Sequence, residues 1–288
     1  MNTLVVFDGN FMAHRARHAT GRLRNGISYG MIKSMDATMR TLESDKQIWV
    51  FDGGLKTERL ELLPEYKGTR GKMDEFMISQ LNWSQPALGH LAPLIRIEGY
   101  EADDIISVIA NNAIESPECD RCVIVSSDKD FLQLCSEKIQ VFNPITKVLH
   151  TEESTKESIS NLSMEHYVFI KSMVGDASDN IDGIKGIGWG TAVKIAGLVG
   201  SVDNLKNIEL KGRMSVANKE ESIAKIRRNI ALITLPKGLH ELPQQLGKSI
   251  MDDIEKHEKD FDAFQMWLES SSMNSILKKV DEWREKYG

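Results

Sequence analysis

The first half of the chain alternates short apolar runs with longer stretches of helical periodicity. The runs TLVVFD (3–8), QIWVFD (47–52) and RCVIVSSD (121–128) predict buried strands, and LIRIEG (94–99) and KIQVFNP (138–144) predict two more. Apolar residues recur at helical spacing over about 29–42 and 102–113. Strands that alternate with helices indicate an α/β fold whose mostly parallel sheet is covered on both faces.

The second half of the chain is dominated by helical signals, and its segment 183–200 (GIKGIGWGTAVKIAGLVG) is rich in glycine. A dinucleotide-binding fingerprint is a weak interpretation, because the sequence before this segment looks helical rather than strand-like. We interpret the segment as two helices joined by a tight turn that carries Gly186, Gly188 and Gly190. Outward backbone amides there can bind phosphate, and the alternative is a plain helix–turn–helix packing motif. We expect Gly188 to need a conformation or a close phosphate approach that a side chain blocks.

The composition is that of a soluble globular protein, with 41% hydrophobic and 27% charged residues among 288. The N-terminus does not resemble a signal peptide, and no apolar run approaches the roughly 18 residues that span a bilayer. We therefore expect a cytoplasmic monomer with no membrane partner. Cys119, Cys122 and Cys135 are too few for a disulfide framework, and the single C-x-x-C predicts reduced thiols rather than a zinc or redox centre.

The net charge of −6, from 36 basic and 42 acidic residues, at first disfavours a nucleic-acid partner. The distribution of charge changes that conclusion. No acid occurs between residues 9 and 35, where the basic residues are Arg15, Arg17, Arg22, Arg24 and Lys33. Nine acids gather in the candidate site described next, and without them basic residues outnumber acidic ones. The acidic total therefore does not exclude DNA.

Three of the predicted strands end in an acid, namely Asp8, Asp52 and Asp128. Any one of these alone is best explained as an ordinary turn or helix-cap residue. In open parallel sheets, however, binding sites form outside the carboxyl ends of the strands. We therefore expect the three side chains to converge at one edge of the sheet.

Further acids occur in close groups in the strings EGYEADDI, SSDKDF and GDASDN. They are Glu101, Asp103, Asp104, Asp128, Asp130, Asp176 and Asp179. Carboxylates so close together repel one another, so a shared site needs cations, and oxygen ligands suit Mg²⁺ or Mn²⁺ better than zinc. Two such ions can clamp a phosphodiester, activate a water and stabilise the leaving oxygen. A helix N-terminus is the alternative explanation for each acid pair alone, and for a single D-x-D it is the better one. No EF-hand loop, P-loop or nucleophilic Ser or Cys context occurs.

Six strings together resemble a known family. VVFDGN, WVFDGG, LPEYKGTR, EGYEADDI, SSDKDFLQL and GDASDNIDGIKGIGWGTA follow one another in the order seen in 5′ nucleases. The chain resembles the bacteriophage 5′–3′ exonucleases, or flap endonucleases, and the 5′-nuclease domain of bacterial DNA polymerase I. The resemblance runs over about 4–235. It implies a Rossmann-like, PIN-like core over 1–155 with a helical arch at about 57–92, then a helical region over 156–288 with a helix–hairpin–helix at about 170–200.

The resemblance also implies roles for individual residues. It places Asp8, Asp52, Glu101 and Asp103 around one metal ion with Asp104 nearby, and Asp128, Asp130, Asp176 and Asp179 around a second. It places Tyr66, Lys67 and Arg70 at the base of the arch, close to the scissile phosphate. The implied ions are two Mg²⁺, for which Mn²⁺ can substitute, and a K⁺ at the hairpin loop. The candidate DNA contacts are Arg15, Arg17, Lys185, Gly186, Gly188, Gly190 and Lys194.

The expected function is hydrolysis of phosphodiester bonds at DNA 5′ ends and 5′ flaps, on flap, nicked or 5′-overhang duplexes, in phage DNA replication and processing. No polymerase region follows, which favours a stand-alone nuclease of phage type. The alternatives are removal of RNA primers from RNA–DNA hybrids, DNA binding without catalysis, and a small PIN-type ribonuclease, against which the length and the glycine hairpin argue. The arch region is less basic than the family suggests, because residues 72–91 carry only Lys72, Asp74 and Glu75 as charged residues.

Overall fold

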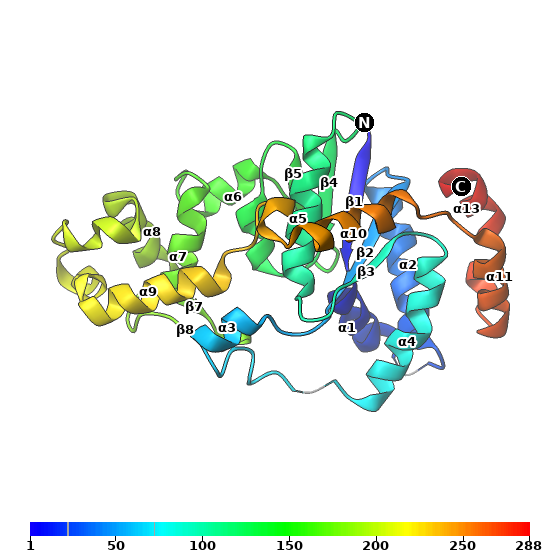
Figure 1. The fold of residues 1–288 in the computed structure, drawn as a ribbon, viewed down its shortest axis with the longest axis horizontal. Helices are drawn as coiled ribbons and strands as arrows, with labels where there is room; N and C mark the ends of the chain where they lie inside the picture. The colour runs from blue at the N-terminus through cyan, green and yellow to red at the C-terminus, as the bar shows by residue number, and fades with distance from the viewer. Residues whose placement is uncertain (22, 72) are drawn as a thin grey trace.

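The protein is built around a six-stranded sheet, seen in a computed structural model that describes residues 1–21, 23–71 and 73–288 (Figure 1). Arg22 and Lys72, which counted above toward the basic run and the arch, lie outside the described residues. The strand order is β3–β2–β1–β4–β5–β6, and only β6 runs antiparallel to its neighbour. The strands are β1 (Thr3–Asp8), β2 (Lys46–Phe51), β3 (Leu94–Arg96), β4 (Arg121–Val125), β5 (Ile139–Asn143) and β6 (Val148–His150). The predicted α/β fold with a mostly parallel sheet is confirmed.

The elements that the apolar pattern missed are those with little apolar surface to bury. Helix α1 (Gly9–Thr20) follows β1 directly and buries only Gly9, Met12, Ala13 and Ala16, so its apolar side is narrow. Strand β6 is a short edge strand with no buried residue. The predicted strand over 94–99 ends earlier, at Arg96.

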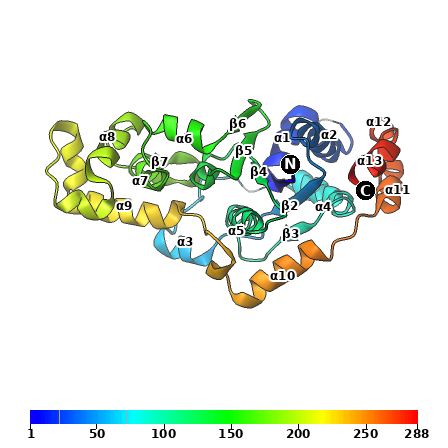
Figure 2. The ribbon, with the colours of Figure 1, turned by 90° about the horizontal axis from the view of Figure 1, so that it is seen from above.

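Helices cover both faces of the sheet, because alternate residues of each strand point to opposite sides. One face packs against α1, α2 (Gly26–Thr41) and α4 (Glu75–Gly89), and the other against α5 (Ala102–Glu115) and α10 (Gln244–Glu255). Trp49 of β2 belongs to the first cluster and Val50 to the second. Figure 2 shows α5 and α10 on the opposite side of the sheet from α1 and α2.

A helical lobe with its own apolar cluster extends from one end of the sheet (Figure 1). Its helices are α6 (Glu152–Ser158), α7 (Glu165–Val174), α8 (Trp189–Val199) and α9 (Glu220–Ile233), with the 3-10 turns η3 (Val202–Lys206) and η4 (Gly212–Asn218) between the last two. The two predicted helices are present as α7 and α8, but the connection between them, here called the hairpin loop, spans residues 175–188 and is longer than the tight turn that was predicted. That connection is longer because it also holds the short pair β7 (Gly175–Asp176) and β8 (Ile181–Asp182) and the turn η2 (Ala177–Asp179).

The last helices of the chain return to the sheet rather than staying with the lobe. Helices α11 (Phe261–Ser270), α12 (Asn274–Leu277) and α13 (Val280–Tyr287) pack into the same cluster as α2 and α4. Trp283 is fully buried there, and its ring lies 6.1 Å from that of Phe264. The domain boundary near residue 155 stays a prediction, but the final helices belong in space with the core, at the far end from the lobe (Figure 1).

The region predicted as an arch contains α3 (Thr57–Leu62), a connecting segment and α4. Helix α4 does not stand free, because it packs on α2, where the buried Ser28 and Ser84 hydroxyls lie 2.7 Å apart. Any arch in the described residues is therefore limited to 63–71 and 73–74. Part of this segment is fixed to the lobe, because Leu63 and Tyr66 pack in one cluster with Ile181, Leu232 and Ile233.

Two expectations from composition can be compared with the structure. The cysteines Cys119, Cys122 and Cys135 are free thiols, as predicted. Within the described ranges, every helix is too short or too polar to cross a bilayer.

Candidate active site

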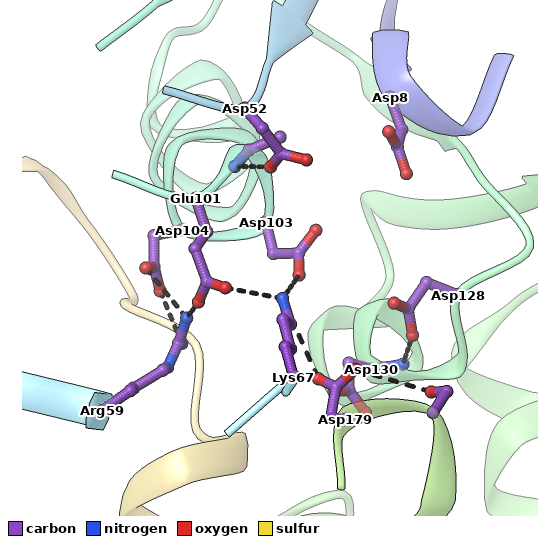
Figure 3. Close-up of polar contacts among 12 residues, drawn as sticks. Asp8, Asp52, Arg59, Lys67, Glu101, Asp103, Asp104, Asp128, Asp130 and Asp179 are labelled. Atoms are coloured by element: carbon purple, nitrogen blue, oxygen red, sulfur yellow. Dashed lines mark hydrogen bonds and ion pairs between the residues drawn. The ribbon is translucent and has the colours of Figure 1, made fainter. Parts of the chain in front are cut away.

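The carboxyl ends of β1, β2 and β4 open into a cleft of about 790 Å³ between the sheet and the helical lobe. Asp8 is the last residue of β1, Asp52 follows β2, and Asp128 lies just beyond β4. All three carboxylates line the cleft, and Figure 3 shows them approaching it from separate elements. Side chains that are distant in sequence therefore meet at one edge, as the strand ends predict.

Hydrogen bonds from neutral groups hold these carboxylates in place. Asp8 caps α1 by accepting from the backbone N–H of Phe11 at 3.0 Å, and it also accepts from the Ser126 hydroxyl at 2.8 Å. The same Ser126 oxygen accepts from the backbone N–H of Asp128 at 3.2 Å, which ties the ends of β1 and β4 together. Asp128 in turn accepts from the backbone N–H of Asp130 at 2.8 Å.

The three strand-end carboxylates resist ionisation unless a cation is bound beside them. None of Asp8, Asp52 and Asp128 forms an ion pair with another residue that the structure describes. Burial, and next the Asp103 carboxylate, raise the pKa of Asp8 to about 8 and that of Asp128 to about 7. The same two causes raise the pKa of Asp52. A cation at this edge would keep all three ionised at neutral pH.

The remaining acids apart from Asp104 surround two buried lysines, the first of which is Lys67. Its Nζ lies 2.6 Å from Glu101 Oε1, 3.6 Å from Asp103 Oδ2 and 3.9 Å from Asp179 Oδ2 (Figure 3). Burial alone would lower the pKa of Lys67, but Asp103 and Glu101 raise it above its ordinary value. Its backbone has a left-handed φ of 54°, and its N–H donates to the Asp179 carbonyl at 2.9 Å. Such a conformation is costly for a residue other than glycine, and here it places the ammonium group among the carboxylates.

The second lysine is Lys171 of α7, which lies on the lobe side of the cleft. It forms ion pairs with Asp130 and with Asp176, the latter at 2.9 Å. Burial would raise the pKa of Asp176, but Lys171 and the Ser178 hydroxyl hold it below its ordinary value. The sequence patterns did not indicate this residue. Its signal is a single lysine inside the otherwise apolar helical run VFIKSMV, shortly before the acids that it neutralises.

Asp104 points away from the cleft and pairs with Arg59 of α3. Both of its oxygens accept from the guanidinium, at 2.8 Å and 3.1 Å, and Arg59 also forms an ion pair with Glu101. This pairing does not support a metal-ligand role for Asp104, and that role stays a prediction. The reason for the orientation of Asp104 is helix geometry, since consecutive side chains on α5 point about 100° apart and Asp103 already faces the cleft. No sequence pattern singled out Arg59.

The three residues expected at the base of the arch divide into two groups. Lys67 and Arg70 line the cleft, and Arg70 forms an ion pair with Asp179. Tyr66 is buried behind them, with its hydroxyl 3.4 Å from Glu101 Oε2 and 3.3 Å from Asp179 Oδ2. Tyr66 therefore supports the carboxylates rather than facing the cleft.

The donor chemistry of the cleft fits hard divalent cations. As the side chains stand, no three carboxylate, imidazole or thiol groups in the described part of the chain are placed to share one ion. The Lys67 and Lys171 ammonium groups lie between the acids instead. Oxygen donors with an excess of negative charge are what Mg²⁺ or Mn²⁺ requires, so the residues present fit such ions once these side chains turn.

The three glycines of the hairpin are open to solvent, and a Cβ added at any of them would meet no atom within 4 Å. Gly186 has a left-handed φ of 87°, whereas Gly188 has an extended backbone with φ of −95°. The sequence predicted a special backbone conformation at Gly188, but the structure has one at Gly186 instead. What Gly188 offers is room for close approach of a ligand to the N-terminus of α8, which it caps. Gly190 offers the same room.

The basic residues expected to contact DNA differ in whether other residues of the protein already bind their charged groups. Lys185 and Lys194 are exposed and form no ion pair with any described residue. Arg15 donates to the Ser34 hydroxyl at 2.7 Å and reaches the Pro144 carbonyl at 3.5 Å. Arg17 forms an ion pair with Asp74. The two arginines therefore serve first to hold α1 against its neighbours.

The fold and the cleft together define a class of protein, namely nucleases with carboxylates gathered at one edge of a parallel sheet beside a helical lobe. The model of the 5′-3′ exonuclease N-terminal resolvase-like domain matches residues 3–161. A 5′-3′ exonuclease of Aquifex aeolicus is 30% identical, over 98% of this chain and 96% of the relative. DNA polymerase I of Bacillus caldotenax is 31% identical over 96% of this chain, which spans 32% of that polymerase.

Solved structures agree on the fold. The T5 5′-exonuclease with bound zinc ions superimposes with a TM-score of 0.76 at 22% identity, over 89% of this chain and 99% of the other. The catalytic core of Rad2 in complex with DNA gives 0.55 at 17% identity, over 98% and 90%. The chain belongs to the 5′–3′ exonuclease family, so the resemblance seen in the sequence is confirmed.

Removing Arg59 tests how the cluster is held. We predict that Arg59→Met lowers the free energy of unfolding by about 3–5 kcal/mol, because it leaves the buried Asp104 charge without a partner. Urea denaturation measures the change. The matched control is Arg227→Met, which removes an exposed ion pair with Asp203 and should cost at most about 1 kcal/mol. Equal losses in the two variants would contradict this account of Asp104.

Proposed function

We propose that this protein is a divalent-metal-dependent, structure-specific nuclease that hydrolyses phosphodiester bonds at DNA 5′ ends and 5′ flaps. The observation that carries the proposal is the cleft itself. Three strand-end carboxylates without ion-pair partners in the described chain, one buried and two half-buried, line it together with Lys67 and Arg70. Membership of the 5′–3′ exonuclease family supports the polarity of the reaction.

Two Mg²⁺ ions, for which Mn²⁺ can substitute, fit the proposal because every candidate donor is an oxygen. Bound ions of this kind polarise the phosphodiester and lower the pKa of an attacking water. The proposed donors come from two groups of carboxylates. One group is Asp8, Asp52, Glu101 and Asp103, and the other is Asp128, Asp130, Asp176 and Asp179. Asp104 is assigned instead to holding Arg59 and, through it, Glu101.

Lys67 and Arg70 act on the phosphate in this proposal. Both line the cleft together with the strand-end carboxylates, and both are tied to Asp179. A fixed cation next to the scissile phosphate stabilises the negative charge that grows on its oxygens in the transition state. Tyr66 keeps Glu101 and Asp179 in place from behind.

The hairpin of the lobe is proposed to bind the duplex part of the substrate. Free amides at the start of α8 can bind a phosphate oxygen, and Lys185 and Lys194 add positive charge beside them. Contacts of this kind are independent of base sequence. A K⁺ held by backbone carbonyl oxygens of the hairpin loop belongs to the same proposal. To contact DNA, Arg15 would first have to give up its hydrogen bond to Ser34, and Arg17 its ion pair with Asp74.

Cleavage of a labelled 5′-flap duplex tests the proposed function. We predict cutting near the branch with Mg²⁺ and none with a chelator. Asp128→Asn should lower the single-turnover rate by at least about 100-fold. Removing a residue that only supports a metal ligand already costs up to about 100-fold in activity, and removing a ligand itself should cost at least as much. Asp182→Asn, an exposed acid just outside the cleft, is the control and should keep the wild-type rate.

The same assay separates the alternatives. Cutting in the chelator, or wild-type activity of Asp128→Asn, would overturn the metal-dependent proposal. Binding of the flap duplex without cutting in Mg²⁺ would identify a non-catalytic DNA-binding protein. A parallel reaction on an RNA–DNA hybrid shows whether primer removal is the preferred activity.

Lys67→Ala tests the role of the buried lysine. Losing one fixed transition-state donor costs about 10²–10³ in rate, so cleavage should fall at least about tenfold more than flap binding weakens. Single-turnover kinetics and equilibrium binding measure the two losses. Lys194→Ala is the contrasting variant, because an exposed phosphate-binding lysine should weaken binding and lower the salt slope by about one unit. Equal losses of rate and binding in Lys67→Ala would mean that Lys67 only positions the substrate.

A further inference from the structure

A second groove, of about 740 Å³, lies on the outer side of α4. Its walls are α4, the loop that precedes α2, and the C-terminal end of α11, and Trp83 and Ile78 of α4 lie in its lining. None of the residues assigned to the carboxylate cluster takes part in it. Figures 1 and 2 show α4 at the same end of the molecule as α11 and α2, away from the lobe.

Helix α4 keeps large apolar side chains exposed, and two of them, Ile78 and Trp83, line the groove. Its inner side fills the core, yet Phe76, Ile78 and Trp83 remain 46%, 45% and 42% exposed. Trp83 is supported from one side by Trp267, whose ring centroid lies 5.8 Å away at a tilt of 38°. A supported indole that keeps a large exposed area is suited to stacking.

The other groups that line the groove are mainly neutral and polar, with one free cation. Arg24 is exposed and forms no ion pair with any residue in the described ranges. Asn25, Gln80 and Asn82 supply amides, and Glu75 is the acid among the lining residues. An aromatic face for bases, a cation for phosphate and amides for base edges are what single-stranded nucleic acid requires. A duplex offers no unstacked base to Trp83.

The groove and the active-site cleft are lined by residues that are close together in the sequence. Met73 lines the cleft, Glu75 lines the groove, and Asp74 between them is held by Arg17 of α1. We propose that the groove binds the unpaired 5′ segment of the DNA substrate beyond the cleft, with one base stacked on Trp83 and a phosphate near Arg24. This inference rests on the proposed function, since it takes the DNA 5′ strand as substrate.

The test is equilibrium binding in a chelator, so that no cutting occurs, with two duplexes of equal length. One carries a 5′ flap of about ten nucleotides, and the other has a nick without a flap. Trp83→Ala should raise the Kd for flap DNA by about tenfold, as expected for the loss of one base–aromatic stack, and leave the Kd for nicked DNA unchanged. Trp83→Phe keeps an aromatic face and should retain most of the affinity. Arg24→Gln should weaken flap binding and lower its salt slope by about one unit.

The control variant is Met266→Ala, which removes another exposed apolar side chain from α11 outside the lining of the groove. Its binding should match the wild type on both duplexes. An unchanged Kd of Trp83→Ala for flap DNA overturns the proposal, and so does an equal loss on both duplexes. If both Trp83 variants fold poorly, photo-crosslinking of wild type with a 4-thiothymidine in the flap decides, because crosslinks must fall on the residues that line the groove, which lie within 24–25, within 75–83 and at Ser270.

The two proposals fail separately. If wild type cuts the flap duplex but Trp83→Ala binds it as tightly as wild type does, the proposed role of the groove is wrong and the proposed nuclease function stands. If Trp83→Ala loses affinity for flap DNA alone but wild type does not cut in Mg²⁺, the proposed role of the groove is supported and the proposed nuclease function is wrong.

Discussion

Mutual repulsion among carboxylates at one edge of the parallel sheet is the constraint on which the rest of the structure depends. The strand topology brings Asp8, Asp52 and Asp128 together, and acids from α5 and the lobe join them. Burial strengthens every interaction between these charges, so the cluster requires cations. The chain supplies some of them itself, as Arg59, Lys67 and Lys171, each from a different segment.

These internal cations also determine the architecture around the cleft. Lys67 joins the segment after α3 to α5 through Glu101 and to the lobe through the Asp179 carbonyl. Lys171 joins α7 to the turn after β4 through Asp130. The walls of the cleft are thus held by the same charges that the proposed metal ions would balance. Movement of a lysine side chain away from the acids is the simplest way for the cleft to accept ions and phosphate.

What the sequence could predict follows from local geometry. Acids after parallel strands must share an edge, so Asp8, Asp52 and Asp128 were predictable together. The partners of Asp104 and Asp130 were not, because Arg59 and Lys171 reach them only through tertiary packing. Helix α1 was missed because small buried residues give a weak apolar pattern, and α11 to α13 carry no motif to show that they return to the core. Among the hairpin glycines, spacing alone could not tell Gly186 from Gly188.

If divalent ions hold the crowded carboxylates of this edge in their ionised form, the free energy of unfolding depends on the Mg²⁺ concentration. A ligand that binds only the folded state stabilises it by about 2.7 kcal/mol at 100 times its Kd. We expect the free energy of unfolding of wild type to rise in this way with Mg²⁺, and that of Asp128→Asn to rise much less. An unfolding free energy that does not depend on Mg²⁺, or that rises equally with a monovalent salt at the same ionic strength, would contradict the account.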